Sequence, residues 1–146
     1  MKMTSLSPNL MVKNVFETVQ YYIRVLWFDC LMAVDYNQHT DFILEDSLEY
    51  AFAIVKKWDV EIMFQAEDSL KQELPGLWKS YDQSSVALYI KMEWIEEYYK
   101  TIKLNVELEQ SLKKTWYGSE EFYIRDLNGY IIGFAEMQKT QKKNFT

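Results

Sequence analysis

The sequence has few of the residues that build metal and thiol centres. Its 146 residues include one cysteine, Cys30, and one histidine, His39. An intramolecular disulfide is therefore impossible, and zinc or iron sites that need two histidines or several cysteines lack their ligands. Cys30 lies in the apolar run VLWFDCLMAV, which favours a buried, inert thiol over a nucleophile paired with His39. We therefore expect no metal and no cofactor.

Glycine motifs and long apolar runs are also scarce. The chain has four glycines and contains neither a P-loop nor a GxGxxG sequence, so the phosphate-binding loops built on those motifs are excluded. No stretch reaches the roughly 18 apolar residues that span a bilayer. The start, MKMTSLSPNL, lacks the apolar core of a secretory signal. These features predict a cytoplasmic protein that has no membrane partner.

The chain has more acidic than basic residues. Three of its 16 basic residues fall in the last ten positions, so residues 1–136 hold 13 basic and 22 acidic residues and carry a formal charge of −9. Such a body repels phosphate backbones and attracts cations. We expect no nucleic-acid partner, although solubility alone would also explain the charge.

Hydrophobic periodicity predicts a first group of elements before residue 66. Asn14 suits a helix N-cap, and Glu17 three residues later completes a capping-box pattern. Val15, Val19 and Tyr22 then follow at helical spacing. The expected order is strand, helix, strand and a hairpin of two strands, over residues 5–13, 14–25, 26–34, 50–56 and 60–65. The polar segment 35–49 is expected to be a loop.

A second group with the same order follows residue 83. A short helix over AEDSLKQEL and a loop at Pro75-Gly76 separate the two groups. The expected strand, helix and three strands lie at residues 84–92, 94–104, 114–117, 120–126 and 129–136. Asn128-Gly129 between the last two strands is typical of a tight hairpin.

The two groups form an internal repeat. Leu10-Met11-Val12 matches Ile90-Lys91-Met92 at an offset of 80, and Ile62-Met63-Phe64 matches Ile132-Gly133-Phe134 at an offset of 70. Phe52-Ala53-Ile54 is aligned with Phe122-Tyr123-Ile124 at that second offset. The repeat predicts an α+β domain over 1–136, built from two βαβββ modules (about 5–65 and 84–136, linker 66–83), and a polar basic tail over 137–146.

This order resembles the vicinal oxygen chelate superfamily of glyoxalases, bleomycin-resistance proteins and extradiol dioxygenases. The resemblance rests on ELPGLW, SSVALYIKMEWIEEYY and above all IRDLNGYIIGF, which is similar to the family's Arg-Asp-Pro-Asp-Gly-Tyr hairpin with Leu127 in place of proline. It implies a curved, cup-like mixed sheet with helices on its outer face, and a homodimer. Metal-using members take ligands from the first and last strand of each module. The corresponding positions here are Ser7, Met63, Ala87 and Gly133.

These four residues are a poor ligand set, because Ala and Gly carry no donor and Met prefers soft metals. The resemblance therefore points to the metal-free, bleomycin-resistance-like branch. Strand alternation places polar and small side chains on the face opposite the helices, which suits a ligand pocket with a hollow floor at positions 7, 87 and 133. A face that merely meets water would show the same pattern. The candidate ligand-binding residues are Ser7, Asn9, Met11, Glu61, Met63, Ala87, Tyr89 and Gly133.

Binding or sequestering an amphipathic or cationic small molecule, without a catalytic residue, is the function that these features favour. Two alternatives stay open. One is a metal-dependent lyase, isomerase or dioxygenase-like enzyme of the same superfamily, with Glu61 as a base. The other is a protein-interaction module whose cup is filled by a partner or by the basic tail.

Overall fold

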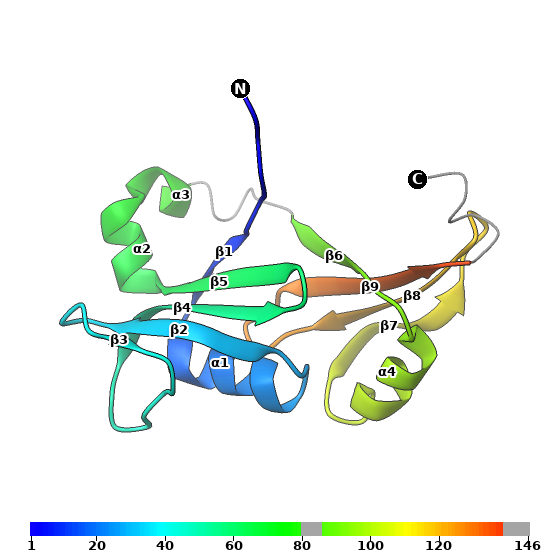
Figure 1. The fold of residues 1–146 in the computed structure, drawn as a ribbon, viewed down its shortest axis with the longest axis horizontal. Coiled ribbons are helices and arrows are strands. Elements are labelled where there is room, and N and C mark those ends of the chain that lie inside the picture. Colours follow the sequence, from blue (N-terminus) through cyan, green and yellow to red (C-terminus); the bar gives the residue numbers. More distant parts are fainter. Residues whose placement is uncertain (80–85, 139–146) are drawn as a thin grey trace. The chain divides into compact units, whose positions relative to one another are not determined.

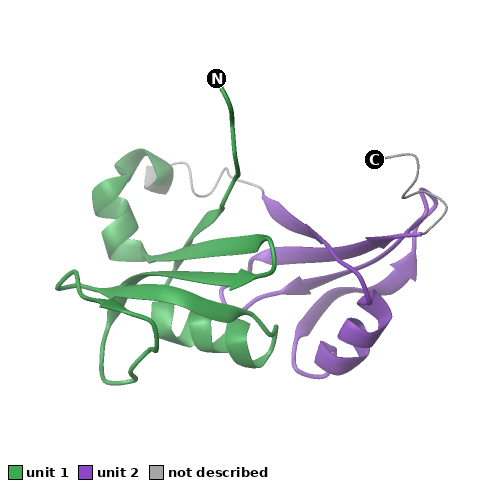
Figure 2. Cartoon of the chain, viewed as in Figure 1, with its two compact units in different colours: residues 1–84 green, residues 85–146 purple. Residues whose placement is uncertain are grey.

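The computed structural model describes residues 1–79 and 86–138, and the chain divides into two compact units (Figures 1 and 2). Unit 1 comprises residues 1–84 and unit 2 residues 85–146. Each unit builds its own mixed sheet. The architecture is α+β, as the sequence predicts. Most of the expected tail and the end of the expected linker lie outside the described residues.

Unit 1 contains a five-stranded sheet in the order β1-β5-β4-β2-β3. Its strands are β1 (Asn9–Val12), β2 (Asp29–Asp35), β3 (Thr40–Asp41), β4 (Tyr50–Lys57) and β5 (Val60–Ala66). Its helices are α1 (Val15–Arg24), α2 (Glu67–Glu73) and α3 (Pro75–Lys79). β1 pairs with β5 in parallel, and the other pairs are antiparallel. Figure 1 shows α1 on one side of this sheet and α2 leaving the end of β5 on the other.

Helix α1 begins where the capping pattern predicts. The Asn14 side chain accepts a hydrogen bond from the Glu17 backbone N–H at 2.9 Å. Val15, Val19 and Tyr22 of the helix are buried, and the ring of Tyr22 lies 4.7 Å from that of Phe64 on β5. The helix thus covers one face of the sheet and leaves the opposite face to other contacts.

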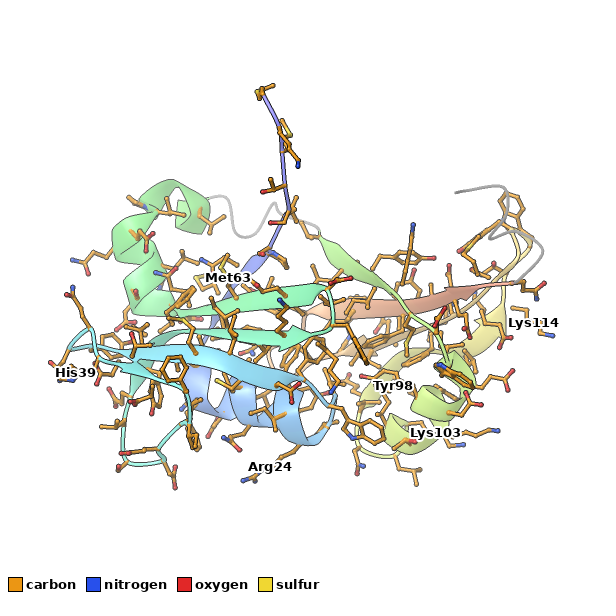
Figure 3. The ribbon with its side chains drawn as sticks, in the orientation of Figure 1. Arg24, His39, Met63, Tyr98, Lys103 and Lys114 are labelled. Atoms are coloured by element: carbon orange, nitrogen blue, oxygen red, sulfur yellow. The ribbon has the colours of Figure 1, made fainter. Side chains whose placement is uncertain are left out.

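Unit 2 contains a four-stranded sheet in the order β6-β9-β8-β7 and one helix. Its elements are β6 (Ala87–Lys91), α4 (Ile95–Ile102), β7 (Glu107–Lys114), β8 (Ser119–Arg125) and β9 (Ile131–Met137). The hairpin between β8 and β9 is confirmed, with Gly129 at a φ of +87°. Tyr98 of α4, labelled in Figure 3, packs on Phe134 with ring centroids 5.2 Å apart. Phe134 in turn stacks on Phe122 at 4.9 Å.

Helix α4 is capped by a distant strand. Trp94 occupies the N-cap position in the left-handed conformation, with a φ of +65° and no capping hydrogen bond from its own side chain. The Glu136 carboxylate on β9 instead accepts the Trp94 N–H at 3.1 Å and the Ile95 N–H at 3.3 Å. Asn14 and Trp94 both occupy N-cap positions, but the capping group in unit 2 comes from a residue 42 positions away.

The strand register confirms most of the repeat and corrects one part of it. Leu10 pairs with Phe64 and Ile90 with Phe134, as the offsets of 80 and 70 require. However, the partner of Phe64 on β4 is Ala53, whereas the partner of Phe134 on β8 is Phe122. The alignment of Phe52 with Phe122 is therefore wrong by one residue, because the β8–β9 turn is one residue longer than the β4–β5 turn.

Several element boundaries differ from the prediction, and the loop expected over 35–49 contains the short strand β3. The strand expected at 114–117 is β7, which ends at Lys114 and begins at Glu107. Its sequence ELEQSLKK has little intrinsic strand preference, so pairing with β8 decides its structure. Pro75-Gly76 opens the short helix α3 instead of a loop, since proline suits the first helical turn. The first strand is shorter than 5–13.

Candidate functional site

The side of the unit 1 sheet opposite α1 combines an apolar centre with polar margins. Asn9, Met63, Ile54 and Met32 form one row across four strands, and all four are half-buried. Figure 3 labels Met63 on β5, on the side away from α1. We call this surface the open face of unit 1, and its members are Asn9, Met11, Met32, Val34, Phe52, Ile54, Glu61, Met63 and Gln65.

A chain of amides links this face to α2. The Asn9 Nδ2 donates to Gln65 Oε1 at 2.9 Å. Gln65 Nε2 donates to Ser69 Oγ at 3.0 Å and to Glu73 Oε2 at 2.7 Å. Gln65 is only 5% exposed, so these bonds satisfy an amide that could not reach water. At the other margin, Ser7 Oγ donates to Glu61 Oε1 at 3.3 Å.

The corresponding side of the unit 2 sheet is filled by tyrosine. Gly133 pairs with Tyr89 on β6 and Tyr123 on β8. A Cβ at Gly133 would lie 2.5 Å from Tyr123 Cε1, so the Tyr123 ring already occupies the space above the glycine. The expectation of a hollow floor at Gly133 is therefore wrong. We call this surface the open face of unit 2, and its members are Ala87, Tyr89, Lys91, Gln110, Lys113, Glu121, Tyr123, Gly133 and Ala135.

Glu121 is a buried carboxylate at the centre of this second face. It is 2% exposed, and it accepts hydrogen bonds from three hydroxyl groups. The Tyr89 hydroxyl lies 2.5 Å from Oε1, the Ser119 hydroxyl 2.8 Å from Oε1, and the Tyr117 hydroxyl 2.7 Å from Oε2. Three donors, Tyr89 from β6 and Tyr117 and Ser119 from the start of β8 and the turn before it, thus enclose one anionic acceptor.

Burial and hydrogen bonding in this cluster keep Tyr89 and Tyr117 protonated and Glu121 ionised. Burial opposes the ionisation of Glu121, but the hydroxyls of Tyr89, Tyr117 and Ser119 outweigh it and lower the pKa of the carboxyl. Burial, followed by the hydrogen bond to Glu121, raises the pKa of Tyr89 well above its ordinary value of 10. The hydrogen bond to Glu121 also raises the pKa of Tyr117. Glu121 is therefore a fixed anion at neutral pH and is poorly suited to exchanging protons with a substrate.

An open depression of about 540 Å³ lies over β7, β8 and the turn between them. Glu121 and Tyr123 form part of its wall, and the Trp116 side chain at its rim is 95% exposed. Trp116 packs edge-to-face on Tyr117 with ring centroids 5.3 Å apart. The exposed aromatic surface of Trp116 is therefore available to a ligand here, above a buried negative charge.

The metal positions that the resemblance implies do not fit a metal. The register places Met63 beside Asn9 and the equivalent Gly133 beside Tyr89. Neither glycine nor Ala87 offers a donor atom, and the Ser7 hydroxyl is bonded to Glu61. Across residues 1–79 and 86–138, no group of three His, Cys, Asp or Glu side chains could hold a metal ion.

Sequence reasoning missed three of the residues that organise the two faces: Tyr117, Glu121 and Tyr123. Alternation places Gln65 on the same face as Met63, although Gln65 is not among the candidate ligand-binding residues, and it also separates Glu121 from its neighbour Glu120 in the strand SEEFYIR. Tyr117 lies in a turn, where the sequence carries no signal for the direction of a side chain.

Solved structures share this architecture at low sequence identity. TioX from Micromonospora sp. ML1 superposes with a TM-score of 0.67 and 13% identity over 93% of this chain and 100% of TioX. A glyoxalase/bleomycin resistance protein/dioxygenase from Nocardioides gives 0.66 and 10% over 95% of this chain and 87% of that protein. The bleomycin-binding protein of bleomycin-producing Streptomyces verticillus, solved with copper(II)-bleomycin, gives 0.62 and 14% over 94% and 99%.

The chain has the glyoxalase/bleomycin-resistance fold. The resemblance seen in IRDLNGYIIGF is thus confirmed at the level of the fold. No protein-family model matches the sequence, and no curated protein matches it. In the described part of the chain, every helix is too short or too polar to cross a membrane.

Proposed function

We propose that this protein binds an amphipathic small molecule, without a metal, on the open faces of its two units. The open face of unit 1 is the observation that carries this proposal. It exposes part of Met32, Ile54 and Met63 on a sheet whose other face packs against α1. Half-buried apolar side chains framed by placed hydrogen-bonding groups are typical of ligand sites.

Two further observations support binding over catalysis. The Glu121 carboxylate is held as an anion by three donors, so it is poorly suited to acid–base chemistry, and its negative charge favours a cation near the open face of unit 2. The formal charge of −9 over residues 1–136 would also concentrate cationic compounds near the protein. A small molecule that is both apolar and cationic therefore fits best.

Titration of the protein with berberine, a fluorescent amphipathic cation, tests this proposal. We expect saturable binding in the micromolar range, and Ile54→Asp should weaken it at least tenfold because it places a charge in the apolar row. Phe42→Asp is the matched control, since Phe42 is 72% exposed beside β3 and its change should leave binding within twofold. No saturation up to about 1 mM, a binding free energy near −4 kcal/mol, would contradict the proposal.

The homodimer implied by the resemblance is part of the same proposal. Sedimentation equilibrium should then give twice the chain mass of 17.6 kDa. A single-chain mass at micromolar concentration would remove the dimer from the proposal.

A further inference from the structure

One buried oxygen on the open face of unit 1 has no hydrogen-bond partner. It is Oδ1 of Asn9, and no other buried side-chain nitrogen or oxygen in the described residues lacks a partner. An unpaired buried acceptor costs folding free energy, and its persistence calls for a physical explanation. The amide chain to α2 provides part of that explanation.

Glu73 fixes the direction of the hydrogen bonds that run from Asn9 through Gln65 to α2. A carboxylate has no proton to donate, so the 2.7 Å contact with Glu73 must be made by the Gln65 amide nitrogen. The Gln65 oxygen then faces Asn9, and the Asn9 nitrogen must donate to it at 2.9 Å. The Asn9 oxygen then has no hydrogen-bond partner. The orientation of both amides, which coordinates alone often leave ambiguous, thus follows from one carboxylate on α2.

Both methionine and polar side chains adjoin Asn9. Met63 is the direct neighbour of Asn9 in the sheet, and Met11 lies two residues further along β1. The hydrogen-bonded pair Ser7 and Glu61 lies on the other side. Methionine side chains reshape easily around a bound ring. A shift of Met63 or Met11 would therefore open the buried Asn9 oxygen to a ligand as a single directional acceptor.

We propose that the open face of unit 1 recognises a planar apolar ligand through an N–H or O–H group that donates to Asn9 Oδ1. This inference rests on the proposed binding function and adds that the ligand carries a hydrogen-bond donor. Glu73 determines that Asn9 presents an acceptor, and it does so without touching the ligand, so it is a positioning residue. A ligand that offers only an acceptor, or no polar atom, leaves the oxygen unpaired and binds more weakly.

Indole and benzofuran form a matched probe pair, because they share a shape and only indole carries an N–H donor. Binding is followed by NMR of the full chain labelled with ¹³C in its seven methionine methyl groups. We expect shifts at Met11 and Met63, and an affinity for indole at least about fivefold higher than for benzofuran.

Asn9→Leu removes the acceptor and keeps the number and branching of the side-chain heavy atoms. The preference for indole should fall to within twofold of equality, while Asn37→Leu, the same change at an exposed position in the turn after β2, should retain it. Glu73→Lys puts a donor in place of the acceptor, which reverses both amides and presents the Asn9 nitrogen to the ligand. That variant should also lose the preference, whereas the matched charge change Glu67→Lys on α2 should keep it.

The outcomes separate this inference from the proposed function. Equal binding of both probes by the unaltered protein, or an indole preference that survives Asn9→Leu or Glu73→Lys, would overturn the inference and leave ligand binding standing. No shift at Met11 and Met63 with either probe at millimolar concentration would overturn both. Asn9→Leu protein that does not melt cooperatively is replaced by Asn9→Ser, which should weaken the preference in the same direction.

Discussion

Gly133 shows how one missing side chain shapes the open face of unit 2. Gly133 has no side-chain atom that could bind a metal, and it leaves no cavity, because the Tyr123 ring lies where its Cβ would be. The absence of a side chain at Gly133 thus makes room for the Tyr123 ring. This arrangement fixes the Tyr123 side chain beside the Tyr89–Glu121 hydrogen bond.

Gly133→Ala is expected to destabilise the protein by about 1–3 kcal/mol, because the added methyl group overpacks against Tyr123. Urea unfolding at pH 7 measures the change. Gly76→Ala is the matched control, since nothing lies within 4 Å of a Cβ there and alanine is preferred to glycine in a helix by roughly 0.5–1 kcal/mol. Equal stability of Gly133→Ala and the unaltered protein would contradict the packing of Tyr123 described above.

Glu121→Gln should destabilise the protein at pH 7 by roughly 1–3 kcal/mol, because three donors lose a charged acceptor. The pKa of Glu121 is lowered on folding, so its contribution is complete above the unfolded value near 4.5 and is lost as the pH falls through the lower folded value. The gap between the two proteins, measured by urea unfolding, should therefore narrow between pH 5 and pH 3. A gap that does not depend on pH would show that the carboxylate charge is unimportant. Glu109→Gln, which breaks a surface pair with Arg125, should cost less than about 1 kcal/mol at either pH.

The two outer helices illustrate what a sequence can and cannot predict about an element. Asn14 directly precedes α1 and caps it, and the capping pattern that Asn14 forms with Glu17 can be recognised in four consecutive residues of the sequence. Trp94 gives no capping signal, and the group that replaces it, Glu136, lies on another element. Likewise, β7 was misplaced because its own residues do not favour a strand, and the Gln65 chain was missed because Glu73 belongs to a helix that follows the strand.

Glu136→Ala should destabilise α4 by about 1 kcal/mol, the usual cost of losing an N-cap. Hydrogen exchange of the α4 amides should accelerate, and the free energy of unfolding in urea should fall by that amount. Glu97→Ala in the first turn of the same helix provides the comparison, since its carboxylate makes no N-cap bond to Trp94 or Ile95. Equal effects of the two changes would contradict the capping role.

At the scale of the whole molecule, the repeat was the most informative signal. It predicted the α+β fold and the order of the elements in each half, because hydrophobic alternation is repeated in both halves. The candidate residues lie on the expected strands except for Ser7, which precedes β1, and their contacts were not foreseen. Contacts such as Tyr89 with Glu121 join segments 32 residues apart, and no local pattern encodes them.

Metal ions should leave the stability of the whole chain unchanged. Melting in EDTA, and then with excess Mn²⁺, Fe²⁺, Ni²⁺ or Zn²⁺, is expected to give midpoints within about 1 °C, because Ser7, Met63, Ala87 and Gly133 are poor ligands together. A bound ion at 100 times its dissociation constant would add about 2.7 kcal/mol and raise the midpoint by about 5–10 °C. Such a rise with any of these ions would favour the enzyme alternative.

The source of the α4 cap also bears on the order in which the chain folds. Helix α1 can close its N-terminal hydrogen bonds as soon as residues 14–24 exist. Helix α4 cannot do so until Glu136, 42 residues further on, has been made and β9 has joined the sheet. Closing so long a loop is entropically costly before the strand pairs. On the ribosome, the first helix should therefore gain protection from hydrogen exchange early, and the second should remain labile until β9 has emerged.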